Sequence, residues 1–241
     1  MASKDSSKKR LDYFKDASTH LMKADERSAI YQLKRGLILK YAHGNAIDIG
    51  AGNGVYTEWL ASVCDKVVAL DESASMLVHL IHRTNDFKNI KYEIGDAIGF
   101  PYKSESFDIG VSYSTLYYID GYFLVLLKMA QALKPNSVLI FDVTNSFSLG
   151  ALYSKYRWPI DQYNVSITDI KSFLSFAGYE IVEEHKTELL PRVNIPVLKN
   201  ILDVRIGNIS LDELISSLPI LRMFAFRTTF VVTRLAGVAH G

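Results

Sequence analysis

Cysteine is nearly absent from this sequence of 241 residues, in which Cys64 is the only one. A single cysteine excludes an internal disulfide framework and suits a reducing compartment. The cysteine and the histidines show no spacing that is typical of a zinc site, so we expect no bound metal. No run of about 18 apolar residues occurs, which argues against a transmembrane helix. These absences favour a cytoplasmic globular protein.

An excess of charge of one sign is also missing. Lys and Arg together number 27 and Asp and Glu number 26, which gives a formal net charge of +1. Such a chain has no global basic field, so nucleic acid is an unlikely partner and a small molecule is the expected one. Hydrophobic residues make up 49% of the chain, enough for a core. We predict a disordered tail over residues 1–10 and a single domain over residues 11–241, as a monomer or homodimer.

Short apolar runs alternate with helical stretches along most of the chain. The strand candidates are residues 46–49, 66–70, 90–94, 107–112, 137–142, 179–189 and 226–234. One of the helices between them has an apolar stripe made of Met76, Leu77, Leu80 and Ile81. Asp120 is a candidate N-cap for the helix that follows it. This order predicts an α/β protein, a three-layer α/β/α sandwich around a seven-stranded, mostly parallel sheet.

A glycine-rich loop joins the first strand to the next helix, in the segment Ala46–Gly54 (AIDIGAGNG). Glycines let the chain turn sharply and let a ligand approach the backbone. The loop follows the carboxyl end of a strand, where open α/β sheets bind ligands. The glycines stand at 50, 52 and 54, whereas a dinucleotide fingerprint needs glycine or alanine at position 55, which is Val55. This spacing argues against a pyrophosphate ligand.

Two acidic residues follow the next two strands. Asp71 ends the second strand, where an acid can accept both hydroxyls of a ribose, and Asp96 follows the third strand. Carboxylates repel phosphates, so the pair favours a nucleoside that is uncharged or cationic, with Asp96 accepting from an exocyclic amine of the base. Taken singly, each acid is equally well explained as a helix cap, and the glycine loop as a tight turn.

These segments together resemble the class I S-adenosylmethionine-dependent methyltransferases, of the small-molecule type similar to the ubiquinone and menaquinone biosynthesis enzymes. The resemblance is carried by residues 46–54 (AIDIGAGNG), 68–76 (VALDESASM), 94–101 (IGDAIGFP), 107–118 (FDIGVSYSTLYY) and 132–140 (ALKPNSVLI). It implies a Rossmann-like sheet whose last strand is antiparallel, with S-adenosyl-L-methionine as cofactor. It divides the chain into an N-terminal helical segment (11–43), a cofactor-binding half (44–145) and a substrate-side half (146–241) with insertions at 146–166 and 191–223.

The resemblance also implies roles for individual residues. Asp71 would hold the ribose, Asp96 would meet the adenine amine, and Tyr113 and Ser114 would line the methionine moiety. The full set of cofactor residues implied in this way is Asp48, Gly50, Ala51, Gly52, Gly54, Asp71, Glu72, Met76, Asp96, Ala97, Tyr113 and Ser114. Many relatives have a histidine near Tyr117 or Tyr118, which this chain lacks, so we assign no catalytic base.

Aromatic residues supply the candidates for the acceptor pocket, namely Tyr118, Tyr156 and Trp158. They indicate either a lid over an apolar or ring-shaped acceptor or ordinary packing of a connecting segment. The insertion at 191–223 is interpreted as a helical pair packed on the sheet edge, as a cap for a lipid-like acceptor, or as a dimer surface. The basic residues Lys34, Arg35 and Lys40 are expected to form a solvated helix face.

The sequence therefore predicts a methyltransferase that moves a methyl group from S-adenosylmethionine to an oxygen or nitrogen of a small metabolite. A non-catalytic module that binds S-adenosylmethionine to stabilise a partner remains an alternative. A nicotinamide-dependent oxidoreductase is less favoured, because the glycine spacing and the acid at position 96 argue against it.

Overall fold

The structure is a computed structural model that describes residues 4–14, 28–148, 150–152, 160–188, 201, 204–207, 209–211, 214–215 and 218–236. The acceptor candidates Tyr156 and Trp158, and much of the insertion predicted at 191–223, lie outside these ranges. The part of the insertion that is described contains a short hairpin of β7 (Arg205–Ile206) and β8 (Ile209–Ser210), which the sequence did not predict.

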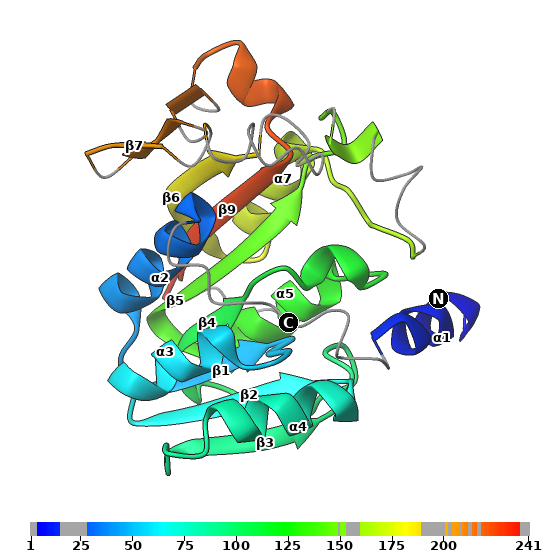
Figure 1. Cartoon of the computed structure of the whole chain (residues 1–241), viewed down its shortest axis with the longest axis vertical. Helices are drawn as coiled ribbons and strands as arrows, with labels where there is room; N and C mark the ends of the chain where they lie inside the picture. Colours follow the sequence, from blue (N-terminus) through cyan, green and yellow to red (C-terminus); the bar gives the residue numbers. More distant parts are fainter. Residues whose placement is uncertain are drawn as a thin grey trace.

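A seven-stranded sheet in the order β3-β2-β1-β4-β5-β9-β6 forms the centre of the molecule (Figure 1). The strands are β1 (Asn45–Ile49), β2 (Lys66–Asp71), β3 (Ile90–Ile94), β4 (Phe107–Ser112), β5 (Leu133–Thr144), β6 (Tyr179–Thr187) and β9 (Arg227–Arg234). The strands from β3 to β5 pair in parallel, and β9 is antiparallel to both β5 and β6. The predicted mostly parallel sheet with an antiparallel last strand is confirmed.

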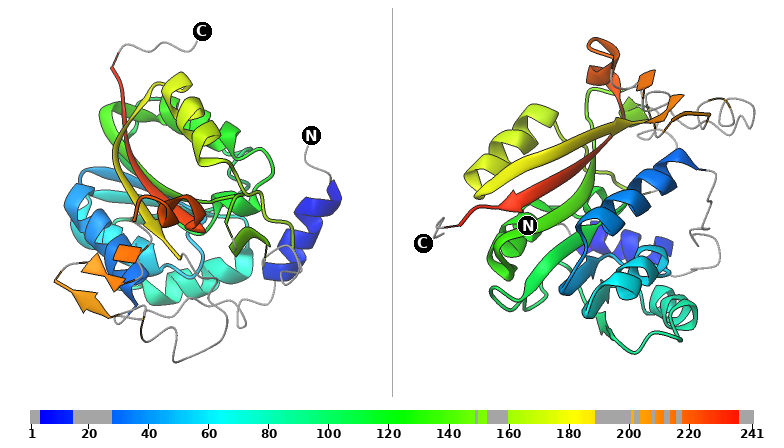
Figure 2. Two further views of the ribbon diagram at one scale, coloured as in Figure 1. Left: turned by 90° about the horizontal axis from the view of Figure 1, so that it is seen from above. Right: turned by 90° about the vertical axis from the view of Figure 1, so that its left-hand side faces the viewer.

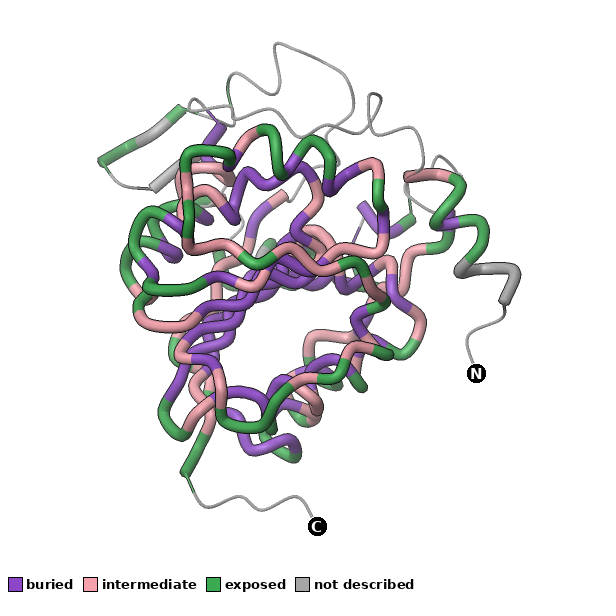
Figure 3. The backbone as a smooth tube through the Cα atoms, turned by 90° about the horizontal axis from the view of Figure 1, so that it is seen from below, coloured by how far each residue is buried: buried purple, intermediate pink, exposed green. Residues whose placement is uncertain are grey.

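Helices cover both faces of this sheet. They are α2 (Ala29–Tyr41), α3 (Val55–Val63) and α4 (Ala74–Arg83) on one face, and α5 (Phe123–Ala132) and α7 (Ile167–Phe176) on the other. Ile140 and Phe141 are adjacent in β5, yet Ile140 packs with α2 and α3 while Phe141 packs with α5 and α7, as the alternation of a strand requires. Figure 3 shows the strands as a buried layer between the helices.

Two details of the predicted helices are wrong. Ile81 was placed on the buried stripe of α4, but its side chain is 46% exposed, and the buried stripe consists of Met76, Leu77 and Leu80. Asp120 does not cap α5, which begins after Tyr122 without a side-chain cap. α4 does have a side-chain cap, because the Ser73 hydroxyl accepts from the Met76 N–H.

Residues 4–10 of the segment predicted as a disordered tail (1–10) are helical in the structure and belong to α1 (Lys4–Phe14). This helix lies apart from the two helical layers and beside the edge where the parallel strands end (Figures 1 and 2). A short helix, η2 (Leu116–Tyr118), follows β4 at the same edge, and η3 (Leu221–Phe224) precedes β9. Among the described residues, no helix is long and apolar enough to cross a membrane.

Candidate cofactor site

A cavity of about 300 Å³ lies at the carboxyl ends of β1, β2, β3 and β4. Each of these strands contributes the residues that follow it, such as Gly50 after β1, Glu72 after β2, Gly95 after β3 and Tyr113 after β4. This is the edge at which open parallel sheets bind ligands, and the volume falls within the range of small-molecule sites. The last turn of α1 closes one side of it with Arg10, Tyr13 and Phe14.

The glycine loop forms the floor of this cavity. Gly50, Gly52 and Gly54 all have positive φ angles, of 71°, 53° and 84°, a conformation that side chains disfavour. A Cβ atom on Gly50 would lie 2.2 Å from the side chain of Thr115, whereas a Cβ atom on Gly52 would meet no atom of the described residues within 4 Å. Gly52 therefore faces open space in the cavity, and a bound molecule can approach its backbone directly.

Asp71 is built into the same loop. Its carboxylate accepts from the backbone N–H groups of Gly52 and Ser73, each at 2.8 Å. Burial raises the pKa of Asp71, and these two backbone donors partly oppose the shift. The carboxylate holds the loop in place and lines the cavity with its remaining acceptor capacity.

Asp96 lines the cavity from the loop after β3, but it is exposed. It accepts from the Gly99 N–H at 3.0 Å, which closes a turn. Asp96 thus closes a turn rather than capping a helix, and its exposed carboxylate keeps acceptor capacity at the cavity.

Asp48 and Gly54 are the two predicted cofactor residues that do not line the cavity. The lining includes the others, namely Gly50, Ala51, Gly52, Asp71, Glu72, Met76, Asp96, Ala97, Tyr113 and Ser114. Gly54 instead begins α3 in the left-handed conformation. Asp48 is 1% exposed and accepts from the Thr57 hydroxyl at 2.6 Å, and its Oδ1 atom has no hydrogen-bond partner among the described residues. Burial raises the pKa of Asp48 to about 7.

Four aromatic residues form a continuous side of the cavity, which we call the aromatic wall (Tyr13, Phe14, Tyr117 and Tyr118). Ring centroids are 5.0 Å apart for Tyr13 and Phe14, 5.5 Å for Phe14 and Tyr118, and 4.5 Å for Tyr117 and Tyr118. Tyr118, one of the residues predicted for the acceptor pocket, therefore lines this cavity. Tyr13 and Phe14 were missed, because a polar N-terminal segment gives no signal of where it docks.

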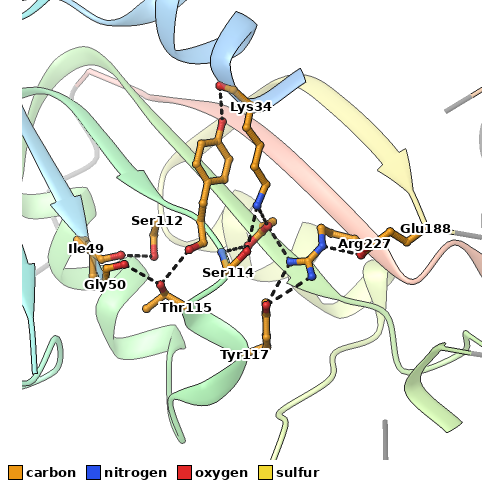
Figure 4. Close-up of polar contacts among 11 residues, drawn as sticks. Lys34, Ile49, Gly50, Ser112, Ser114, Thr115, Tyr117, Glu188 and Arg227 are labelled. Atoms are coloured by element: carbon orange, nitrogen blue, oxygen red, sulfur yellow. Dashed lines mark hydrogen bonds and ion pairs between the residues drawn. The ribbon is translucent and has the colours of Figure 1, made fainter. Parts of the chain in front are cut away.

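Behind the cavity lies a cluster of four charged residues, which we call the buried charge cluster (Lys34, Asp142, Glu188 and Arg227; Figure 4). Lys34 and Asp142 are buried, whereas the side chains of Arg227 and Glu188 are each 12% exposed. Lys34 Nζ lies 2.7 Å from Asp142 Oδ2, Arg227 Nη1 lies 2.8 Å from the same oxygen, and Arg227 Nε lies 2.8 Å from Glu188 Oε2. Its members come from α2, β5, β9 and the residue after β6. The cluster contains two cations and two anions, so it brings opposite charges together without a net charge.

The cluster corrects the prediction that Lys34, Arg35 and Lys40 form a solvated face. The Lys34 side chain is 1% exposed, while Arg35 and Lys40 are exposed. Burial lowers the pKa of Lys34, and Asp142 only partly compensates because it is shared with Arg227. Burial alone would raise the pKa of Asp142, but Lys34 and Arg227 together outweigh it and lower its pKa. One signal was present in the sequence, since Lys34 falls on the same helical stripe as Leu37.

Ser114 connects the buried charge cluster to the cavity. Its backbone N–H donates to Asp142 Oδ1 at 2.7 Å, and its hydroxyl lies 3.1 Å from Lys34 Nζ. Its φ angle of 57° is a conformation that a serine rarely adopts, so the Asp142 bond holds a strained turn directly after β4. Arg227 also contacts the hydroxyl of Tyr117, at 3.4 Å from both Nη atoms. The cluster therefore fixes two residues that line the cavity.

Known proteins similar to this chain match it over the segment that builds the cavity. A family model described as a methyltransferase domain matches residues 47–141. Demethylmenaquinone methyltransferase of Staphylococcus aureus is 29% identical over 124 residues, which are 48% of this chain and 52% of that protein. The chain thus spans about half the length of the curated relatives it matches.

Solved structures with the same fold cover most of the chain. An S-adenosylmethionine-dependent methyltransferase from Mesorhizobium loti has a TM-score of 0.65 at 16% identity, covering 86% of this chain and 98% of its own. The N-methyltransferase NodS from Bradyrhizobium japonicum, solved with S-adenosylhomocysteine, has a TM-score of 0.55 at 18% identity, covering 86% and 85%. At these identities the likeness concerns the fold.

A mostly parallel sheet with a glycine-floored cavity at its strand ends defines a Rossmann-like α/β protein of the ligand-binding kind. Within that class, the matched methyltransferase domain covers the strands and loops that build the cavity. Residues 47–141 are thus similar to a methyltransferase domain, and the fold is that of solved S-adenosylmethionine-dependent methyltransferases.

Proposed function

We propose that this protein transfers a methyl group from S-adenosylmethionine to an oxygen or nitrogen atom of a small metabolite. The observation that carries the proposal is the open space in front of Gly52, in a loop whose backbone is fixed by Asp71. A nucleoside fits this loop. It must approach a backbone without side chains, which Gly52 offers, and it needs acceptors for its hydroxyl and amino groups, which carboxylates supply.

The residues around the cavity divide the work of holding the donor. Asp71 accepts from the ribose hydroxyls, Asp96 accepts from the adenine amine, and Tyr113 and Ser114 border the methionine end. S-adenosylmethionine supplies a methyl group that is already activated by its positively charged sulfur. The protein is left to orient the acceptor in line with that methyl group and to exclude water, which the aromatic wall favours.

The aromatic wall also supports a class of acceptor. Flat apolar groups gain most from contact with aromatic rings, so an acceptor with a planar apolar part suits this side of the cavity. The curated relatives are named demethylmenaquinone methyltransferases, so demethylmenaquinone is assayed beside oxygen and nitrogen acceptors. Because this quinone takes a methyl group on a ring carbon, its turnover would contradict the assignment to oxygen or nitrogen.

Cofactor binding is tested by calorimetry with S-adenosylhomocysteine on two cavity variants. Asp71→Ala removes the acceptor for the ribose, and we expect binding weaker by about 1.5–3 kcal/mol. Gly52→Ala places a methyl group in the open space, and we expect a similar or larger loss of affinity. The matched control is Gly36→Ala, because Gly36 is exposed on α2 and a Cβ atom there meets nothing within 4 Å. Unchanged affinity in both cavity variants would contradict the proposal.

Catalysis is tested separately from binding. Wild-type protein is incubated with methyl-labelled S-adenosylmethionine and demethylmenaquinone or a metabolite extract, and release of S-adenosylhomocysteine and labelled product is measured. Binding without turnover against any acceptor would favour the non-catalytic module. A thermal shift with NADH and none with S-adenosylmethionine would favour an oxidoreductase instead.

A further inference from the structure

Helix α1 meets the cavity through its last turn. Arg10, Tyr13 and Phe14 line the cavity, and the Arg10 side chain is 10% exposed. Lys8, two residues earlier on the same helix, is exposed. The contacts described for α1 that reach the cavity therefore come from its C-terminal end, which lies on the candidate cofactor site.

Arg10 bridges two lips of the cavity. Its Nε and Nη2 atoms donate to the two carboxylate oxygens of Glu72, at 2.5 and 2.8 Å, and its Nη1 atom donates to the carbonyl oxygen of Tyr118 at 2.8 Å. Glu72 follows β2 and Tyr118 follows β4, so one guanidinium joins two loops on either side of the ligand space. Only an arginine offers a planar fork with enough donors for this arrangement.

Contacts of Phe14 add to this docking. The hydroxyls of Ser73 and Ser75 both donate to the carbonyl oxygen of Phe14, at 3.2 Å each, and the Phe14 ring packs edge-on against Tyr118. Ser73 and Tyr118 themselves line the cavity. The end of α1 is thus held partly by residues that also line the cavity.

The docking is strong enough to order α1 but weak enough to reverse. A polar helix of 11 residues is too short to be stable alone in water, so its structure depends on the contacts of its last turn. Glu72 keeps 24% of its side chain exposed, and ion pairs with that access to solvent contribute little net stability. The described contacts that would have to break for α1 to leave are one ion pair, a few hydrogen bonds and the ring contact of Phe14 with Tyr118.

We propose that α1 is a reversible cover of the candidate cofactor site and that Arg10 is its latch, a positioning residue that must release Glu72 before a ligand enters or leaves. The proposal rests on the proposed function only for the identity of the ligand. It assigns to the N-terminal helix the gating of donor entry and product release, and it makes Tyr13 and Phe14 parts of the site that are present only when the latch is closed.

Stopped-flow binding of S-adenosylhomocysteine tests the latch. In Arg10→Ala we expect both the association and the dissociation rate constants to rise at least about tenfold, the factor that corresponds to about 1.4 kcal/mol. The equilibrium affinity should change much less, since a cover affects both directions. The control Lys8→Ala removes an exposed charge from the same helix and should leave both rates unchanged. Unchanged rates in Arg10→Ala, or a faster dissociation alone, would overturn the proposal, because a faster dissociation alone indicates a direct ligand contact.

A double-substitution cycle with Glu72→Gln tests whether Arg10 acts through Glu72. If the two residues form one latch, the double variant should be no faster than the faster single variant. Independent, multiplying effects would contradict the pairing. Absence of S-adenosylhomocysteine binding by the wild-type protein would instead refute the proposed function, which keeps the two failures distinct. Hydrogen exchange of residues 11–14 should slow when the ligand is added to wild type but not in Arg10→Ala.

Discussion

Arg10 and Lys34 both place a cation next to the cavity, but their surroundings are opposite. Arg10 comes from a peripheral helix and meets Glu72, and the two side chains are 10% and 24% exposed. Lys34 comes from α2 and meets Asp142, and these side chains are 1% and 0% exposed. Water can replace Glu72 as the partner of Arg10, whereas the Lys34 side chain is too deeply buried for water to replace Asp142. Arg227, the other cation on Asp142, also pairs with Glu188. An ion pair of the same kind is therefore partly solvated and can open between Arg10 and Glu72, whereas it is fully buried and permanent between Lys34 and Asp142.

The largest effect is expected when the buried charge cluster loses the carboxylate that its two cations share. Asp142→Ala leaves Lys34 and Arg227 buried without that partner, and we expect a loss of about 3–5 kcal/mol in the free energy of unfolding. Urea unfolding measures it. As a control, Lys40→Ala breaks the exposed pair with Glu183 and should not change stability measurably. A loss below about 1 kcal/mol in Asp142→Ala would show that the stability of the protein does not depend on the carboxylate that Lys34 and Arg227 share.

Asp48 gives a contrasting case, a buried carboxylate beside which the described part of the chain places no cation. Its pKa is raised to about 7 by burial, above the usual value for an unfolded chain. Stability that depends on neutral Asp48 is thus fully present below about pH 4 and is lost as the pH rises to about 7. In Asp48→Asn we expect this decline to flatten, with higher stability than wild type at pH 8 and similar stability at pH 4. Melting curves from pH 4 to 8 measure it, and parallel curves for the two proteins would contradict the prediction.

A smaller effect on stability is expected when the buried charge cluster loses Lys34 instead of Asp142. In Lys34→Met, Asp142 keeps Arg227 and the Ser114 N–H as partners, and the methionine fills most of the volume of the lysine. We expect a loss of about 1 kcal/mol or less by urea unfolding. A loss as large as that of Asp142→Ala would mean that Asp142 depends on Lys34, and the description of a shared carboxylate would be wrong.

The smallest effect on stability is expected when the ion pair of Arg10 with Glu72 is removed. Arg10→Ala should change the free energy of unfolding by about 1 kcal/mol or less, because the pair is partly exposed and most of the sheet and its helices do not touch it. Chemical unfolding followed by far-UV circular dichroism measures it. A loss comparable to that of Asp142→Ala would make α1 part of the folded core and would remove the contrast between the two sites.

The sequence predicted the elements whose signal is local. Each strand has a short apolar run bounded by turn residues, and the glycine loop has a spacing that only a strand-to-helix turn explains, so the sheet and the cavity floor could be located. The observed β5 extends beyond the predicted strand, since Leu133 and Thr144 pair with neighbours that cannot be known from one segment alone.

Contacts between distant segments could not be predicted in the same way. Arg10 docks on a residue 62 positions away, and Lys34 meets Asp142 across more than a hundred residues, so neither has a local pattern to reveal it. A lysine in a helix is normally solvated, and only its burial in the folded protein brings Lys34 into an ion pair with Asp142. The roles of Asp71 and Asp96 in binding stay predictions, and Tyr156 and Trp158 lie outside the described residues.

The place of β9 in the sheet has a consequence for synthesis on the ribosome. β9 is made after every other strand of the sheet, yet it lies between β5 and β6. Until β9 emerges, β5 has one long edge of unpaired backbone, β6 has no neighbour, and Arg227 is not yet available to Asp142. From the completion of β5 until β9 is made, the nascent chain therefore carries an open apolar strand edge and an incomplete charge cluster, which is a template for self-association. Completion of the sheet by one late strand makes final folding an event that follows translation of almost the whole domain.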